Sequence, residues 1–159
     1  MVATRTSLLQ RGVIAGLAGG LAEIIWVSVY SEMTGGNAAV IARGVTTAAG
    51  LNALLPSMSV TVGIVVHMVV AVAYGLLLAV IWQWLARRTR STAICYLFVL
   101  VVMAGAWAMN FFVILPIVSA PFVTLLPYMV SLTSKLFFGL AAAETLRRLN
   151  AAVTVRAAT

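Results

Sequence analysis

The chain has 159 residues, of which 64% are apolar and 8% are charged. An average soluble domain has about 45–50% apolar and about 25% charged residues. A globule with so few charges could not cover its surface with polar groups, and disordered chains have the opposite bias. The composition therefore excludes an ordinary water-soluble protein and indicates a lipid bilayer as the solvent.

Four apolar segments are long enough to cross a hydrocarbon core about 30 Å thick, which takes roughly 20 helical residues. They run from Gly12 to Tyr30, from Val62 to Leu85, from Thr92 to Leu115 and from Tyr128 to Leu146. Helices satisfy every backbone polar group in lipid, and these segments are about twice the length of a barrel strand. The sequence predicts an all-α fold, with one domain built as a four-transmembrane-helix bundle.

Basic residues gather at one set of span ends. Eight of the ten lie there: Arg5, Arg11, Arg87, Arg88, Arg90, Arg147, Arg148 and Arg156. The opposite connections carry only Arg43, and Lys135 lies inside a span. By the positive-inside rule both termini are expected in the cytoplasm. Because the bases flank spans and do not form a patch on a soluble domain, nucleic acid is not an expected partner.

The first outer connection, from Ser31 to Thr61, is expected to contain a short interfacial helix, with Asn37 as its N-cap and Pro56 as its stop. Its two faces would differ in polarity, with an apolar face of Val40, Ile41, Val45, Ala48 and Ala49 and a largely polar face of Arg43, Thr46 and Thr47. Such a helix would lie on the outer membrane surface. The alternative is an ordered loop packed over the mouth of the bundle.

The second outer connection, from Pro116 to Pro127, has no charged residue and contains three prolines. These prolines are expected to break helices outside the spans. A loop this apolar would be unusual in water. It is expected to dip into the outer end of the bundle, to be covered by another subunit, or to rest at the membrane interface.

Small residues recur at a spacing of four and predict a helix-packing seam. The first span carries Gly12, Gly16 and Gly20, and similar runs in the second and fourth spans include Gly75 and Gly139. Small residues allow helix backbones to approach closely in lipid, where packing drives association. The seam could serve the bundle itself or a partner protein.

Each predicted span contains one strongly polar residue at a similar depth. These residues are Glu23, His67, Asn110 and Lys135, which lie five to seven residues from the outer span ends. At 1.5 Å per residue, this spacing is a depth of roughly 8–11 Å. Ionisable groups in hydrocarbon are costly without partners, so this intramembrane polar layer should face inward. We expect a Glu23–Lys135 ion pair, with His67 and Asn110 hydrogen-bonded nearby and Ser131 or Ser134 joining them.

Three interpretations of the polar layer remain open. It could fix the register of the helices, form a proton or ion relay or part of a ligand pocket, or hold a metal or haem. The third is disfavoured because Cys95 and His67 are the sole cysteine and histidine, so no metal site and no cofactor are expected. Glu144 is expected to pair with Arg147 and Arg148 at the inner interface.

Soluble catalytic motifs are missing from the sequence. It has no GxSxG, no Walker loop, no HExxH and no CxxC. The glycines of the first span are not a dinucleotide fingerprint, because no strand precedes them. We therefore expect no catalytic residue and no enzyme activity.

Three segments carry a resemblance to a known class of proteins. They are HMVVAVAYGLLLA from His67, NFFVILP from Asn110 and LLPYMVSLTSKLFFGLAAAE from Leu125. Together they resemble small four-span bacterial inner-membrane proteins that are generally described as uncharacterised. The resemblance implies a topology and a location but no activity.

Two function classes follow from these features. The first is a non-catalytic accessory or assembly subunit of a larger bacterial inner-membrane complex, with a respiratory or other oxidoreductase assembly as one setting. The second is a small transporter or channel, formed by a homo-oligomer, in which Glu23, His67 and Lys135 line a polar route. Four helices are few for a complete alternating-access pathway, which favours the first class. Its partners would be the lipid bilayer and other membrane subunits.

Overall fold

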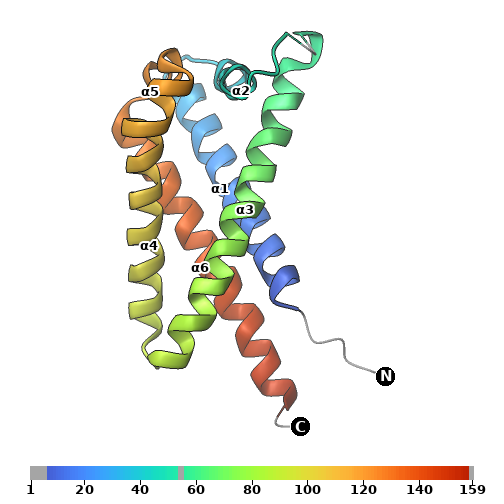
Figure 1. The fold of residues 1–159 in the computed structure, drawn as a ribbon, viewed down its shortest axis with the longest axis vertical. Helices are drawn as coiled ribbons and strands as arrows, with labels where there is room; N and C mark the ends of the chain where they lie inside the picture. Colours follow the sequence, from blue (N-terminus) through green and yellow to red (C-terminus); the bar gives the residue numbers. More distant parts are fainter. Residues whose placement is uncertain (1–6, 54–55, 158–159) are drawn as a thin grey trace.

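The computed structural model describes residues 7–53 and 56–157, and all regular structure in this part of the chain is helical. Four long helices form a bundle: α1 (Leu8–Met33), α3 (Ser59–Arg88), α4 (Thr92–Met109) and α6 (Tyr128–Ala157) (Figure 1). The short helix α2 (Ala38–Ala48) lies across one end, beside the segment that follows α4. The predicted all-α class is confirmed, and the long helices extend past the predicted boundaries at most of their ends.

Within the described residues, three helical segments are long and apolar enough to cross a membrane by length and composition. They are Leu8–Met33, Pro56–Arg88, which includes the 3-10 turn η1 (Pro56–Met58), and Thr92–Val118. Their outward faces expose many large apolar side chains, including Leu21, Ile25, Val69 and Leu97. A water-soluble bundle would pay a large free-energy cost for such faces, whereas lipid solvates them. The helix α6 is not among the three, since Lys135 and Glu144 interrupt its apolar sequence.

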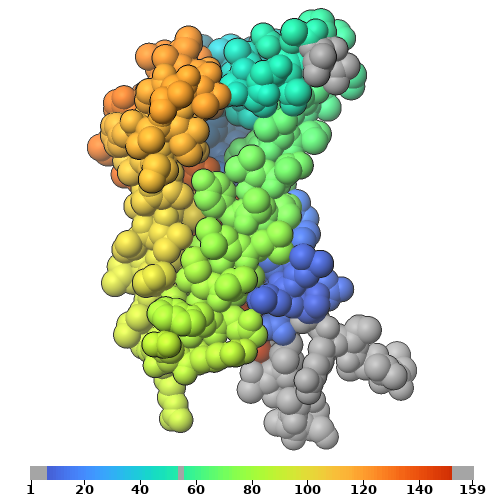
Figure 2. Space-filling model, in the orientation of Figure 1, coloured from blue at the N-terminus to red at the C-terminus, as the bar shows by residue number. Residues whose placement is uncertain are grey.

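The helices pack in the order α3, α1, α6 and α4. The helix α1 lies against both α3 and α6, and α6 also packs on α4. In contrast, α3 and α4 meet near their connecting turn and diverge toward α2 (Figure 1). The space-filling view shows α2 and residues 115–125 covering that end above the hollow between α3 and α4 (Figure 2). We call it the capped end, and the opposite end, where α3 turns into α4, the basic end.

The predicted glycine seam is used inside the bundle. A Cβ on Gly75 of α3 would overlap the backbone of Gly12 and Gly16 on α1. A Cβ on Gly16 would in turn lie 2.5 Å from the carbonyl oxygen of Ala71. The helices α1 and α3 therefore touch backbone to backbone, which only glycine permits. On α6, Gly139 packs less closely against α4, because a Cβ on Gly139 would lie 3.2 Å from a side-chain atom of Met103 and would not meet its backbone.

The prediction that Pro116 breaks the helix outside the span is wrong. The helix α4 continues through a π-helical turn, η2 (Asn110–Ile114), into α5 (Leu115–Val118), and Pro116 lies within this continuous path. In the π-helical turn the N–H of Leu115 donates to the carbonyl of Asn110, five residues earlier. A proline removes one N–H and clashes with the carbonyl four residues before it. A wider turn just before Pro116 accommodates that ring, so the helix ends only at Val118.

The connection between α1 and α3 contains the expected short helix, and Asn37 caps it by accepting a 2.9 Å hydrogen bond from the N–H of Ala39. Pro56 as its stop is wrong, because α2 ends at Ala48, and Gly50 turns the chain with a φ of +71°. Thr46 is also not on a polar surface. It is fully buried and donates a short hydrogen bond to the carbonyl of Ser59. The helix α2 is thus tied to the start of α3.

Candidate functional site

A buried carboxylate lies where α1, α3 and α6 meet. Glu23 lies one helical turn after Gly19 and Gly20, on the same face of α1. It is almost fully buried. The hydroxyl of Ser134 on α6 donates a 3.2 Å hydrogen bond to its Oε1 atom. The glycines let α3 and α6 approach α1 closely, and this proximity places partners from both helices around one carboxylate.

Lys135 supplies the charge that balances Glu23. Its Nζ atom lies 2.8 Å from Oε1 and 2.9 Å from Oε2 of Glu23, so the ion pair predicted from the sequence is present. The ammonium also lies 5.7 Å from the ring centroid of Tyr74 and 5.8 Å from that of Phe138. Aromatic faces attract a cation at these distances, most strongly where water is excluded. No sequence pattern predicted either ring beside Lys135, although Phe138 lies three residues after Lys135, on the same face of α6.

His67 reaches the same carboxylate from α3. Its Nε2 atom lies 3.3 Å from the carbonyl oxygen of Gly20 and 3.9 Å from Oε2 of Glu23. A neutral ring protonated on Nε2 can donate to the Gly20 carbonyl, whereas a charged ring would add a second cation beside Glu23. We call Glu23, His67, Ser134 and Lys135 the polar centre.

Asn110 does not belong to the polar centre, contrary to the expectation from its depth. It is half-buried at the start of η2, and no hydrogen bond between described side chains links it to Glu23 or Lys135. The depth of Asn110 in the membrane, which was estimated from its position in the sequence, does not tell which side of the helix carries its side chain. Trp107, one turn earlier, faces α6 instead and donates a 3.0 Å hydrogen bond to the hydroxyl of Ser131. The two candidate serines therefore have separate partners.

A second polar group joins α4 to α6 at the basic end. Arg147 forms two hydrogen bonds of 2.7 Å with the carboxylate of Glu144, and Arg148 also pairs with this carboxylate. The hydroxyl of Tyr96 on α4 donates a short hydrogen bond to Glu144. The sequence predicted the two arginines from their spacing but not Tyr96, since no local pattern connects residues 48 positions apart.

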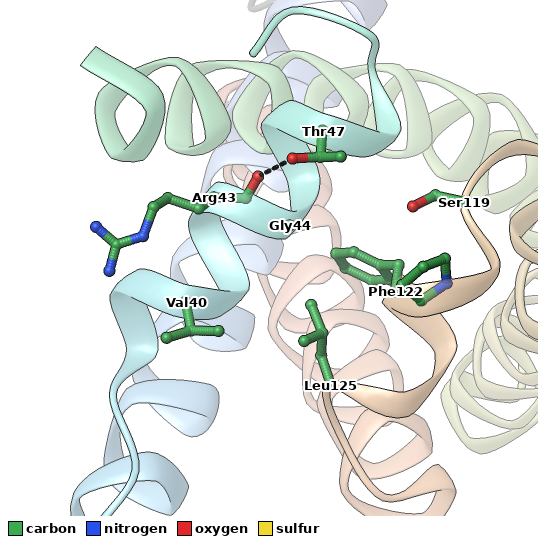
Figure 3. A pocket seen from close by; sticks show the side chains of 8 residues that line it. Val40, Arg43, Gly44, Thr47, Ser119, Phe122 and Leu125 are labelled. Carbon is green, nitrogen blue, oxygen red and sulfur yellow. Dashed lines mark hydrogen bonds between the residues drawn. The ribbon is translucent and has the colours of Figure 1, made fainter. Parts of the chain in front are cut away.

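A small cleft of about 190 Å³ opens at the capped end between α2 and the 3-10 turn η3 (Ala120–Thr124) (Figure 3). Its walls are largely apolar and include Val40, Gly44, Phe122 and Leu125. The hydroxyl of Thr47 is directed to the carbonyl of Arg43 at 3.1 Å, and the Arg43 side chain extends away from Phe122. Ligand sites usually combine an apolar lining with converging polar groups. This cleft offers little specific recognition.

The chemistry available to the polar centre is limited. Glu23 and Lys135 neutralise each other, and Ser134 donates to the same carboxylate. Within the described part of the chain, no group of three or more histidine, cysteine, aspartate or glutamate residues could hold a metal ion. The arrangement can lock three helices in register, and proton exchange among Glu23, His67 and Lys135 is the one chemical step that its titratable groups could perform.

Comparison with protein-family models, with curated proteins and with solved structures finds no match to this chain.

Proposed function

We propose that the chain is a four-span protein of a bacterial inner membrane, with α6 as the fourth span. The support is that the charges Lys135 and Glu144, which lower the hydropathy of α6, both have partners of opposite sign. Lys135 is directed at Glu23 inside the bundle, and Glu144 pairs with Arg147 and Arg148 at the basic end. A paired charge inside a bundle costs far less in lipid than an isolated one. The helix α6 also runs beside α1 and α4, two of the apolar segments.

The proposed orientation places the basic end in the cytoplasm. Among the described side chains, Arg11, Arg87, Arg88, Arg90, Arg147 and Arg148 belong to that end. Arg5 lies outside the described residues, and so does the side chain of Arg156. At the capped end, Arg43 is the one basic residue among those that the structure describes. Basic residues near span ends favour the cytoplasmic side.

For the function itself, we propose a non-catalytic accessory or assembly subunit of a larger membrane complex. The observation that carries this proposal is the apolar surface of the capped end, beyond the central parts of the spans. Met33 at the end of α1 is 82% exposed, and Ile117 in α5 is 80% exposed. Neighbouring Val118 is exposed as well. These residues are the last of the apolar segments Leu8–Met33 and Thr92–Val118, where the hydrocarbon gives way to headgroups, and exposed apolar side chains at that level are suited to protein contacts.

The structure shifts the proposed contact surface away from the glycines. The seam of α1 is filled by α3, so it is not free to receive a partner helix. A partner would instead meet the capped end around Ile117. A respiratory or other oxidoreductase assembly remains one proposed setting for such a subunit.

The test is native electrophoresis after mild extraction from the source membrane, with the tagged chain expressed at its natural level. We expect a discrete species much larger than the 16.8 kDa monomer. Ile117→Ser combined with Val118→Ser should shift it to the monomer. Leu9→Ser is the matched control, because Leu9 is 63% exposed at the other end of the bundle. A lone monomer for the unmodified chain would contradict the proposal.

A specific observation keeps transport as the second candidate. The side chains of His67 and Lys135 retain 24% and 14% of their surface, so the polar centre is not fully sealed. The expected result for a transporter is a solute or proton flux in liposomes that Glu23→Gln abolishes while the bundle stays folded. Absence of flux with the unmodified chain would remove this candidate.

A further inference from the structure

The turn between α3 and α4 carries three arginines within four residues. Arg87 and Arg88 end α3, Arg90 follows, and all three are exposed. The turn stands at the edge of the basic end, and no other helix lies in front of it in the face that Figure 2 shows (Figures 1 and 2). Three positive charges in so short a segment repel one another, and a negative group bound beside them would lower this repulsion.

The acidic side chains of the chain, all of which lie in its described part, do not provide this negative charge. It contains three acidic residues in total. Glu23 is paired with Lys135, and Glu144 is paired with Arg147 and Arg148. The remaining acid, Glu32, is one residue from the capped end of α1, which is the far end of the bundle. Every carboxylate side chain is therefore too distant or already engaged.

The backbone does not compensate either. The carboxyl end of α3 and the amino end of α4 meet at this turn, where Ser91 caps α4 by accepting from the N–H of Ile94. Helix ends carry roughly half an elementary charge, negative at the carboxyl end and positive at the amino end. These two partial charges largely offset each other, which leaves the three arginines uncompensated.

One of the arginines is placed beside an exposed tryptophan. The guanidinium carbon of Arg88 lies 4.7 Å from the ring centroid of Trp84, and Trp84 is 49% exposed on the outer surface of α3. Tryptophan favours the level of the lipid headgroups. Stacking on an exposed ring therefore holds the guanidinium at the depth where phosphates of surrounding lipids lie.

We propose that Trp84, Arg87, Arg88 and Arg90 form a binding site for the phosphate headgroup of an anionic phospholipid in the cytoplasmic leaflet. This proposal rests on the membrane location and orientation proposed above, but not on the accessory role. Guanidinium groups bind phosphate through paired hydrogen bonds, and they remain charged at any physiological pH. The lipid would supply the negative charge that the chain lacks at this turn.

The experiment is a lipid titration of the purified protein in detergent, followed by native mass spectrometry, with phosphatidylglycerol and phosphatidylcholine as probes. We expect tighter retention of phosphatidylglycerol. Replacing Arg87, Arg88 and Arg90 together with glutamine should weaken it on the order of a hundredfold. Arg43→Gln, which removes an arginine from the capped end, is the matched control and should leave retention unchanged.

The single variant Arg88→Gln serves if the triple variant does not fold, and it should weaken phosphatidylglycerol retention roughly fivefold. Equal retention of the two lipids, or equal retention by parent and variants, would overturn the proposal. So would a loss of a protein complex with no change in lipid retention, since that result assigns the arginines to an acidic partner. If the unmodified chain migrates as a lone monomer yet discriminates between the lipids, the accessory role fails and the lipid site stands.

Discussion

Glu23 and Glu144 are both glutamates that pair with basic residues of α6, yet their surroundings differ. Glu23 is almost fully buried, and its partners come from α3 and α6. Glu144 retains 33% of its side-chain surface, and both of its cationic partners lie one turn away on the same helix. The first group therefore joins three helices around a desolvated charge, whereas the second is mostly local and reached by water.

This difference indicates that the contribution of an ion pair to stability depends on whether water can reach the charge that is left when the pair is broken. A buried charge without its partner has no solvent to replace it, and removing one partner is strongly destabilising. An exposed pair exchanges its partner for water and counterions at little cost. We expect mutations at the two glutamates to differ accordingly.

Lys135→Met should have the largest effect, because it leaves the Glu23 carboxylate buried without a cation. We expect a loss of about 3–5 kcal/mol in the free energy of unfolding. Unfolding by sodium dodecyl sulfate in mixed micelles would measure it. The double variant Glu23→Gln with Lys135→Met removes both charges and should recover most of the loss. A double variant as unstable as the single one would show that the charge is not the cause.

Gly75→Ala should have the second largest effect on stability, since its new Cβ would overlap the backbone of Gly12 and Gly16 and force α1 away from α3. Overpacking of this kind costs about 1–3 kcal/mol. The polar centre would loosen, because His67 on α3 reaches Glu23 on α1, while the Glu144 group joins α4 to α6 and should be unaffected.

The control for this substitution is Gly105→Ala, at a position in α4 where a Cβ would have no neighbour within 4 Å. Alanine is the better helix former by about 1 kcal/mol, so this variant should be neutral or slightly stabilised in the same unfolding assay. If both glycine variants lose stability equally, the close contact between α1 and α3 is not what Gly75 provides.

Glu144→Gln should have the smallest effect. The charge that it removes is partly exposed, and both arginines can turn to water or lipid phosphates. We expect a shift in the thermal midpoint several times smaller than that of Lys135→Met, and weaker still at high salt, as differential scanning fluorimetry would show. A loss comparable to that of Lys135→Met would mean that the contact from Tyr96 makes this group structural.

The sequence predicted those parts of the fold that depend on local pattern. Apolar length located the long helices, and the four-residue glycine spacing located the contact of α1 with its neighbour, although not the identity of that neighbour. Equal depth in the membrane led to the pairing of Glu23 with Lys135, because a buried charge must find its opposite. These arguments need only composition and position along a helix.

The remaining features depend on how helices are rotated and placed. Asn110 shares the depth of the polar centre but makes no hydrogen bond with Glu23 or Lys135, and depth carries no information about rotation around the helix axis. Thr46 was expected on a polar face, yet α3 covers it and its hydroxyl donates a hydrogen bond to the carbonyl of Ser59. Tyr96 on α4 donates a hydrogen bond to Glu144 on α6. Such contacts arise from tertiary packing between helices, and the sequence alone does not show which side chains of different helices meet.

The π-helical turn at Asn110–Ile114 has a consequence for how this chain tolerates changes in length. Trp107, Phe111 and Leu115 are all buried, although successive steps of four residues in a regular helix would drift by about 40° each. The wider turn takes up that drift and keeps Leu115 beneath the cap. Deleting one residue within this turn would convert it into a regular α-helical turn and leave the segment beyond it facing nearly the same way, whereas inserting one more residue would rotate that segment by about 100° and send Leu115 toward the surrounding lipid. The number of residues in this turn therefore determines which side of the helix Leu115 occupies.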